Sequence, residues 1–158
     1  MIDDLYSGTI LRLAANMPRA GRLAQADASA EKVAKLCGSR VIIDVVLGED
    51  GRIADFAQEV KACALGQAAA AVLGAHVVGA APEEIEMARD AFRAMLKAGG
   101  APPTGRFSDL SMLEPVKDYP QRHASTLLAF EATVEACALA RAQAATRTGT
   151  RTSPADAA

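Results

Sequence analysis

Three consecutive stretches decide the fold: Val41–Leu47 (VIIDVVL), the turn sequence Gly48–Gly51 (GEDG) and Arg52–Val60 (RIADFAQEV). The outer two are strand-like, and the glycine-rich, acidic stretch between them is typical of a β-turn, so together they predict a β-hairpin. A three-residue loop that ends in glycine would pair Gly48 with Arg52, so that residues facing each other have numbers that sum to about 100.

This register places two of the three cysteines, Cys37 and Cys63, at the open end of the hairpin, because their numbers also sum to 100. Cβ atoms facing each other there would lie roughly 5 Å apart if pairing continued that far. Gly38 follows Cys37, and helix-like sequence follows Cys63, so both sulfurs are expected on turns just past the strands, where a ligand can be exposed. The placement predicts a paired-thiolate site, although buried structural cysteines are common and the pair alone is a weak indicator.

Composition excludes several classes of protein. The 158 residues, 51% hydrophobic and 23% charged, fit one compact domain with an adequate core. A net charge of −2 and only 4% aromatic residues leave neither a basic face nor stacking platforms, so nucleic acid is not an expected partner. No apolar run approaches the roughly 20 residues that span a bilayer, and the acidic start lacks the features of a signal peptide. We therefore expect a cytoplasmic protein without membrane contact, whose cysteines are free thiols or metal ligands rather than disulfides.

The remaining sequence predicts helices around a small sheet. Arg22–Ala28 is a candidate first strand, which would give the hairpin a third strand and make the sheet large enough to be stable. Residues 1–146 are predicted to form one domain and residues 147–158 a disordered tail. The sequence thus predicts an α+β fold with a three-stranded antiparallel sheet and about five helices. Helices are expected over residues 5–16, 63–78 and 82–99, and from Pro120 to about Ala145.

Short motifs along the chain carry a family resemblance. They are Leu5-Tyr6, Pro18-Arg19, Gly21-Arg22-Leu23, Cys37-Gly38, Ala62-Cys63-Ala64-Leu65 and Leu113-Glu114-Pro115-Val116-Lys117. From about Leu5 to Ala145 the chain resembles the NifU/IscU-type iron–sulfur cluster assembly scaffolds, and Val116–Arg122 is most similar to the SufU-like branch. The resemblance implies the SufE/NifU-like α+β fold, with helices on one side of the sheet. It also implies a carrier that accepts sulfur from a cysteine desulfurase, holds iron or zinc, and passes a cluster to recipient proteins.

The family's ligand set, three cysteines and an aspartate, is incomplete here. Its first two cysteines match Cys37 and Cys63, whereas the aspartate falls on Ser39. The third cysteine falls on Ser125 in the SufU-like alignment, or on Pro120 in an IscU-like alignment. A serine hydroxyl stays protonated unless a metal activates it, so Ser125 is a poorer candidate ligand than a thiolate. The resemblance implies a cargo of an iron–sulfur cluster, [2Fe–2S] in the first instance, or of iron, with zinc as the alternative.

Other side chains are candidates to replace the missing ligand. His123 lies close to Ser125 in sequence, and its imidazole suits both zinc and iron, although a surface or capping histidine is the commoner case. Cys137 is about 18 Å further along the predicted helix at roughly 1.5 Å per residue, and its apolar stripe predicts a core position. His76 is expected on a helix surface. Alternatively, a homodimer would bring together Cys37 and Cys63 from two chains, giving the four thiolates that a [2Fe–2S] cluster commonly uses.

Two classes of function follow from this reading. The first is an assembly scaffold or sulfur carrier, not an enzyme, that binds its cargo through Cys37 and Cys63. The alternative is a divergent paralogue that acts as a protein-binding or regulatory module without cluster assembly, which the serines at positions 39 and 125 favour. A thiol transferase is a weaker third reading, because no histidine can be assigned to Cys63 as a base by spacing.

Overall fold

The predicted hairpin forms the centre of the sheet. The computed structural model describes residues 7–157, and side chains through residue 146. Strands β2 (Ser39–Leu47) and β3 (Ile53–Lys61) pair antiparallel, and the Gly48 amide donates to the Arg52 carbonyl at 2.8 Å, as the predicted turn requires. Leu47 faces Ile53, but a β-bulge next to this pair shifts the remaining register by one residue. The ladder therefore ends at Arg40 facing Lys61, and both cysteines lie just beyond it.

The third strand is not where the sequence placed it. Strand β1 (Ala28–Ala34) pairs antiparallel with β2, and the sheet order is β1-β2-β3. The predicted strand Arg22–Ala28 is wrong, because residues 22–27 form a loop that is held by Asp44 of β2. The Asp44 carboxylate, only 1% exposed, accepts from the Arg22 guanidinium at 2.7 and 3.0 Å and from the Leu23 amide at 2.9 Å.

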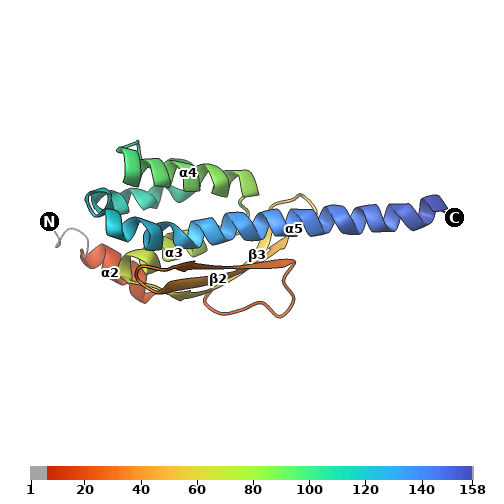
Figure 1. Ribbon diagram of the computed structural model, residues 1–158, viewed down its shortest axis with the longest axis horizontal. Helices are drawn as coiled ribbons and strands as arrows, with labels where there is room; N and C mark the ends of the chain where they lie inside the picture. Colours follow the sequence, from red (N-terminus) through yellow and green to blue (C-terminus); the bar gives the residue numbers. More distant parts are fainter. Residues whose placement is uncertain (1–6, 158) are drawn as a thin grey trace.

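Helices pack on the sheet to complete the α+β fold (Figure 1). In the described part of the chain there are four α-helices and two 3₁₀ segments, close to the predicted five helices. Helix α5 packs on β1 and β2, and α3 packs on β3 and α5. Helix α4 packs on α5, and η1 packs on α3 and α4. The helices are α2 (Gly8–Ala15), α3 (Ala64–His76), α4 (Pro82–Ala98) and α5 (His123–Ala157), with η1 (Gly105–Asp118) and η2 (Pro120–Arg122) between the last two.

The core lies between the sheet and the helices. Val41, Ile43 and Val45 of β2 alternate toward it, as expected for a strand with one covered face. Aromatic packing adds to this layer, since the Phe130 ring of α5 makes edge contacts with Phe92 and Phe107 at centroid distances of 5.8 and 5.4 Å. No helix among the described residues is both long and apolar enough to cross a bilayer.

Helix α5 extends beyond the body of the molecule (Figure 1). Its last buried residue among the described side chains is Ala140. The predicted boundary at residue 146 lies inside α5, which the structure continues to Ala157. The division into a domain of residues 1–146 and a disordered tail of residues 147–158 stays a prediction.

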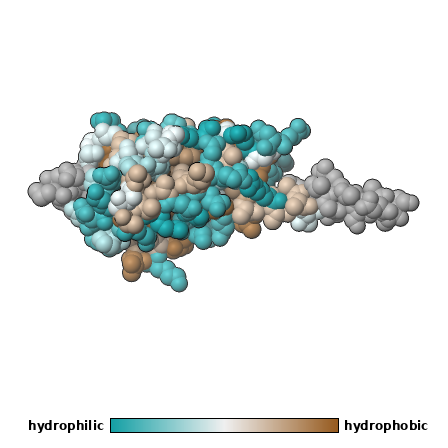
Figure 2. Space-filling model, turned by 90° about the horizontal axis from the view of Figure 1, so that it is seen from above, coloured by the Kyte–Doolittle hydropathy of each residue, from teal (hydrophilic) through white to brown (hydrophobic). Residues whose placement is uncertain are grey.

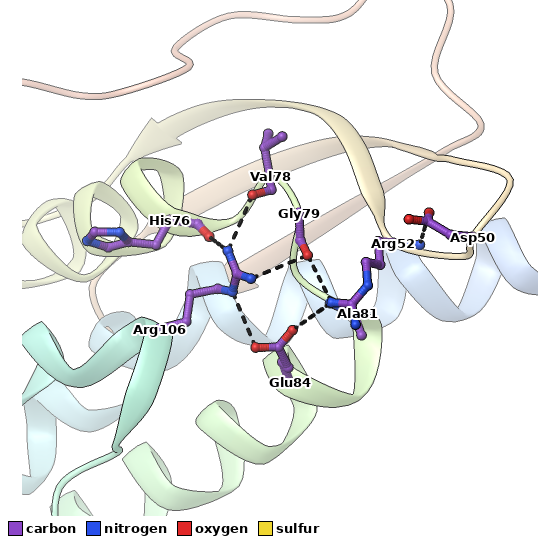
Figure 3. Close-up of polar contacts among 8 residues, drawn as sticks. All are labelled: Asp50, Arg52, His76, Val78, Gly79, Ala81, Glu84 and Arg106. Atoms are coloured by element: carbon purple, nitrogen blue, oxygen red, sulfur yellow. Dashed lines mark hydrogen bonds and ion pairs between the residues drawn. The ribbon is translucent and has the colours of Figure 1, made fainter.

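An arginine cluster ties the end of α3 to the neighbouring elements (Figure 3). Arg106 of η1 pairs with Glu84 of α4 at 3.3 Å, and Arg52 of β3's preceding turn contacts the same carboxylate at 3.3 Å. Free carbonyl groups at a helix C-terminus need donors, and these two guanidinium groups provide them. The Arg106 acceptors are the carbonyl oxygens of His76, Val78 and Gly79, at 3.1 to 3.4 Å. This cluster holds the end of α3 that is remote from Cys63.

Hydrophilic residues cover most of the face shown in Figure 2, with hydrophobic residues between them. Among the described residues, the exposed large hydrophobic side chains are Leu11, Val33, Leu36, Met87 and Leu139. Leu36 is the most exposed of these, at 90%, and it directly precedes Cys37.

Candidate functional site

Cys37 lies on the turn between β1 and β2. Residues 35–38 form this turn, which Gly38 closes with a φ of +73°, a conformation that favours glycine, and with an amide that donates to the Ala34 carbonyl at 2.9 Å. The Cys37 side chain is exposed. Its thiol is therefore accessible from outside the chain at one end of the sheet.

Cys63 occupies the N-cap position of α3. Its backbone is extended, with φ −65° and ψ 170°, and its carbonyl accepts from the Gln67 amide at 2.9 Å. The thiol forms no capping hydrogen bond to the helix. It is half-buried and faces the Ser125 hydroxyl of α5, with the Cys63 Sγ and Ser125 Oγ atoms 3.6 Å apart.

A buried serine lies against each of the two thiols. Ser39 Oγ lies 3.0 Å from Cys37 Sγ, and Ser39 and Ser125 are only 3% and 2% exposed. The hydrogen bond from Ser39 lowers the pKa of the Cys37 thiol despite the opposing effect of partial burial. Each thiol thus lies against one serine hydroxyl, and the register of the β2–β3 ladder, continued past Arg40 and Lys61, brings Cys63 next to Cys37. These serines occupy the positions that the resemblance assigned to the aspartate and to the third cysteine.

A close helix contact holds Ser125 in place. Gly66 lies in the first turns of α3, and a Cβ atom there would come within 2.9 Å of the Ser125 carbonyl oxygen and of the Ala62 Cβ. Contacts this short require one of the elements to move, so only glycine allows α3 and α5 to approach this closely. The close approach sets the position of Ser125 relative to Cys63.

His123, the other candidate ligand, is engaged elsewhere. It is the first residue of α5, is 5% exposed, and its Nε2 lies 3.0 Å from the Val116 carbonyl oxygen of η1. This is a buried histidine rather than the surface or capping residue that was the commoner expectation. The contact links α5 to η1, and a ligand role for His123 stays a prediction.

The remaining two candidates lie where the sequence predicted. Cys137 is 2% exposed in the core, and burial raises the pKa of its thiol to about 11. His76 is on the surface at the end of α3, where its Nε2 lies 3.5 Å from Asp109, and its side chain is 42% exposed.

The donor set of a single chain is therefore small. Within the part of the chain that the structure describes, no three His, Cys, Asp or Glu side chains lie close enough together to hold a metal ion. The site offers two thiols and two hydroxyls. Thiolates are the ligands that zinc and cluster iron prefer, and two of them leave either metal with further coordination positions to fill.

Comparison with known proteins identifies the family. The family model described as the NifU-like N-terminal domain matches residues 5–126, which include Cys37, Cys63 and both serines. The chain belongs to this family. Family membership confirms the resemblance that the sequence motifs indicated. No curated protein sequence matches the chain.

Solved structures agree with this assignment. The chain is 48% identical to the N-terminal part of a nitrogen-fixing NifU-like protein from Brucella abortus, with a TM-score of 0.86, over 89% of this chain and 96% of that one. It also resembles an iron–sulfur cluster assembly scaffold protein proposed for the SUF system of Fervidobacterium islandicum, with 21% identity and a TM-score of 0.78, over 85% and 98% of the two chains. The second similarity shows the fold alone. The two together confirm the α+β fold with a three-stranded antiparallel sheet.

Proposed function

We propose that this NifU-like chain is an iron–sulfur cluster assembly scaffold or sulfur carrier that binds its cargo through Cys37 and Cys63. The observation that supports this most directly is that both thiols lie just past the same end of the β2–β3 ladder, each against a buried serine hydroxyl. Cys37 is exposed and Cys63 is half-buried, which suits a site that must take up a cargo and release it. The role is that of a carrier rather than an enzyme.

Ligand number argues for a shared site. A [2Fe–2S] cluster commonly has four cysteine thiolates, two on each iron, and one chain offers two near Ser125. Two chains that meet at this end of the sheet would supply the full set, so we propose a homodimer for the cluster-bound form. Ser125 and His123 are the further ligands that one chain could add. The first lies 3.6 Å from Cys63 Sγ, whereas the second would have to leave the Val116 carbonyl.

The rim of the site suits a protein partner. Leu36, 90% exposed, and Val33, 54% exposed, lie on the turn and strand that lead to Cys37. Apolar side chains beside an exposed thiol can pack against a protein that delivers or receives sulfur. We propose a cysteine desulfurase as the donor and cluster-recipient proteins as acceptors, acting in the cytoplasm.

One observation favours the alternative function. Serine replaces both the aspartate and the third cysteine of the family pattern, and in the described residues two thiols are the whole set of strong ligands at the site. A paralogue that keeps the fold and its binding partners, but assembles nothing, would tolerate both replacements. Zinc would be a cargo that needs fewer protein ligands than a cluster. One zinc ion held by two thiolates can complete its tetrahedron with water or a partner's ligand.

Metal analysis of the purified protein separates these functions. Wild type, the Cys37→Ala/Cys63→Ala double variant and a Cys137→Ala control are purified without oxygen, and iron, zinc and acid-labile sulfide are measured per chain together with the molar mass. Iron and sulfide in a dimer, lost only in the double variant, support the shared scaffold. Zinc alone, lost in the same variant, supports a sulfur carrier with bound zinc. If all three proteins fold but contain no metal, the result supports the protein-binding module.

A further inference from the structure

We propose that Cys37 and Cys63 also form a resolving pair, which converts a persulfide received on Cys37 into free sulfide and an intramolecular Cys37–Cys63 disulfide. This inference rests on the proposed function, in that the chain must first accept sulfur. It adds a chemical step to that function, because the chain itself would reduce the sulfur that it receives.

The geometry assigns different tasks to the two thiols. Cys37 is exposed on the β1–β2 turn beside Leu36, so an incoming persulfide can reach it. Cys63 is half-buried at the start of α3, against Ser125, and is less accessible to an outside donor. A thiol that is reached first and a second thiol sheltered next to it are the two parts of a resolving pair.

The fold places the two sulfurs within reach of each other. The β2–β3 ladder ends at Arg40 and Lys61, and its register, continued past that pair, would bring Cys63 opposite Gly38, next to Cys37. Each thiol lies against a buried serine hydroxyl, Cys37 Sγ 3.0 Å from Ser39 Oγ and Cys63 Sγ 3.6 Å from Ser125 Oγ. The third cysteine, Cys137, is buried on α5 and cannot compete. A disulfide needs a Cα separation of roughly 4.4–6.8 Å, and residues beside each other at the paired ends of neighbouring strands are the ones that can meet it.

The reaction balances without an added reductant. A persulfide donor transfers its outer sulfur to the Cys37 thiolate and leaves as a thiol. The Cys63 thiolate then attacks Cys37 Sγ, the bond between Cys37 Sγ and the outer sulfur breaks, and the outer sulfur leaves as HS⁻. The outer sulfur gains two electrons, and the two cysteine sulfurs lose two as the disulfide forms. Clusters contain sulfur as sulfide, so this step delivers the oxidation state that assembly needs. A low-molecular-weight thiol must then reduce the Cys37–Cys63 disulfide before the pair can bind metal.

A defined donor tests the proposal. Fully reduced wild type, Cys63→Ser and Cys37→Ser are mixed with glutathione persulfide without oxygen. Released sulfide, free thiols and intact mass are measured, followed by peptide mapping. Serine preserves the size of each side chain, and circular dichroism checks that the variants fold. As a second measurement, all three proteins are equilibrated with oxidised and reduced glutathione, which forms the disulfide directly if the geometry permits it.

The expected result is one sulfide released per wild-type chain, with a Cys37–Cys63 disulfide and Cys137 still reduced. Cys63→Ser should instead retain the mass of one extra sulfur on Cys37 and release sulfide only at the background rate of the donor. A stable persulfide on wild-type Cys37, or no disulfide in the glutathione buffer, would overturn the inference, and metal binding by the pair would then leave the proposed function intact. Absence of both persulfide and metal from the pair would overturn both.

Discussion

Replacing Ser125 with cysteine should create a third thiolate ligand at the site. In a tetrahedral zinc site with bonds of about 2.3 Å, two sulfurs lie about 3.8 Å apart. The Ser125 Oγ atom already lies 3.6 Å from Cys63 Sγ, and Ser125 is 2% exposed and held by the contact between α3 and α5. A sulfur at that position would therefore need little movement to share a metal ion with Cys63.

The gain in zinc affinity can be estimated from the ligand count. Four-ligand structural zinc sites bind with about 10–16 kcal/mol, or roughly 2.5–4 kcal/mol for each ligand. Since every 1.4 kcal/mol is a factor of ten, Ser125→Cys should bind zinc roughly 10²–10³ times more tightly than wild type. The variant keeps Gly66, because the close contact at this glycine sets the position of residue 125.

The assay is competition with a chromophoric zinc chelator at pH 7. The matched control is Ser108→Cys, which adds the same thiol at an exposed position of η1. That position is near Asp109, the partner of His76 at the far end of α3 from Cys63. If Ser125→Cys binds zinc no more tightly than Ser108→Cys, residue 125 is not at the third ligand position, and the geometric argument for the site is refuted.

Three further predictions concern ionisation and stability. Ser39→Ala should raise the pKa of Cys37, because the main hydrogen bond that lowers it is lost. The pH profile of the Cys37 alkylation rate should therefore have its midpoint at a higher pH than in wild type. Asp44→Asn should lower the free energy of unfolding at pH 7 by about 2–3 kcal/mol, measured by urea denaturation, because the hydrogen bonds to a buried charge are weakened. The stabilisation by Asp44 should be present above the pKa of about 3.9 for an unfolded aspartate and lost as the pH falls through its lower folded value. Cys137, whose pKa is raised to about 11, should resist alkylation at pH 8 until the protein is unfolded, as followed by peptide mass spectrometry.

Each of these has a contrary result. An unchanged pH profile for Cys37 in Ser39→Ala would mean that Ser39 does not stabilise the thiolate. If the free energy of unfolding falls with acid in the same way for wild type and Asp44→Asn, the Asp44 carboxylate makes no pH-dependent contribution to stability. Alkylation of native Cys137 at a rate near that of Cys37 would show that α5 opens far more often than its burial implies.

The hairpin could be predicted from sequence because its signals are local. Val41–Leu47 is apolar and β-branched, and the following glycine-rich turn allows few alternatives. Strand β1 lacks such a signal, since its buried residues Ala28, Ala30 and Ala34 are small and its other positions are mostly polar. The more strand-like segment that precedes it is instead fixed by Arg22, whose partner Asp44 is distant in sequence. A long-range ion pair of this kind has no signature in the local pattern.

The site could be predicted in part for the same reason. Cys37 and Cys63 are linked by the hairpin register, so their proximity follows from a local rule. Ser125 reaches Cys63 only because α5 packs against α3 at Gly66, and this tertiary contact leaves no mark in residue spacing. The resemblance to the NifU/IscU-type scaffolds supplied position 125 where spacing could not. Likewise, no sequence pattern shows that the His123 ring is held by the Val116 carbonyl.

The β-bulge affects how this hairpin tolerates insertions and deletions. The extra residue is Ala54, which lies between the residues that face Val46 and Leu47, close to the turn and far from the thiols. A turn that lengthens or shortens by one residue can be absorbed by losing or enlarging this irregularity. Without it, β3 would slide along β2 by about 3.3 Å per residue and carry Cys63 away from Cys37. The turn at residues 48–51 is therefore the end of the hairpin where insertions and deletions can accumulate during evolution while the spacing of the two thiols is preserved.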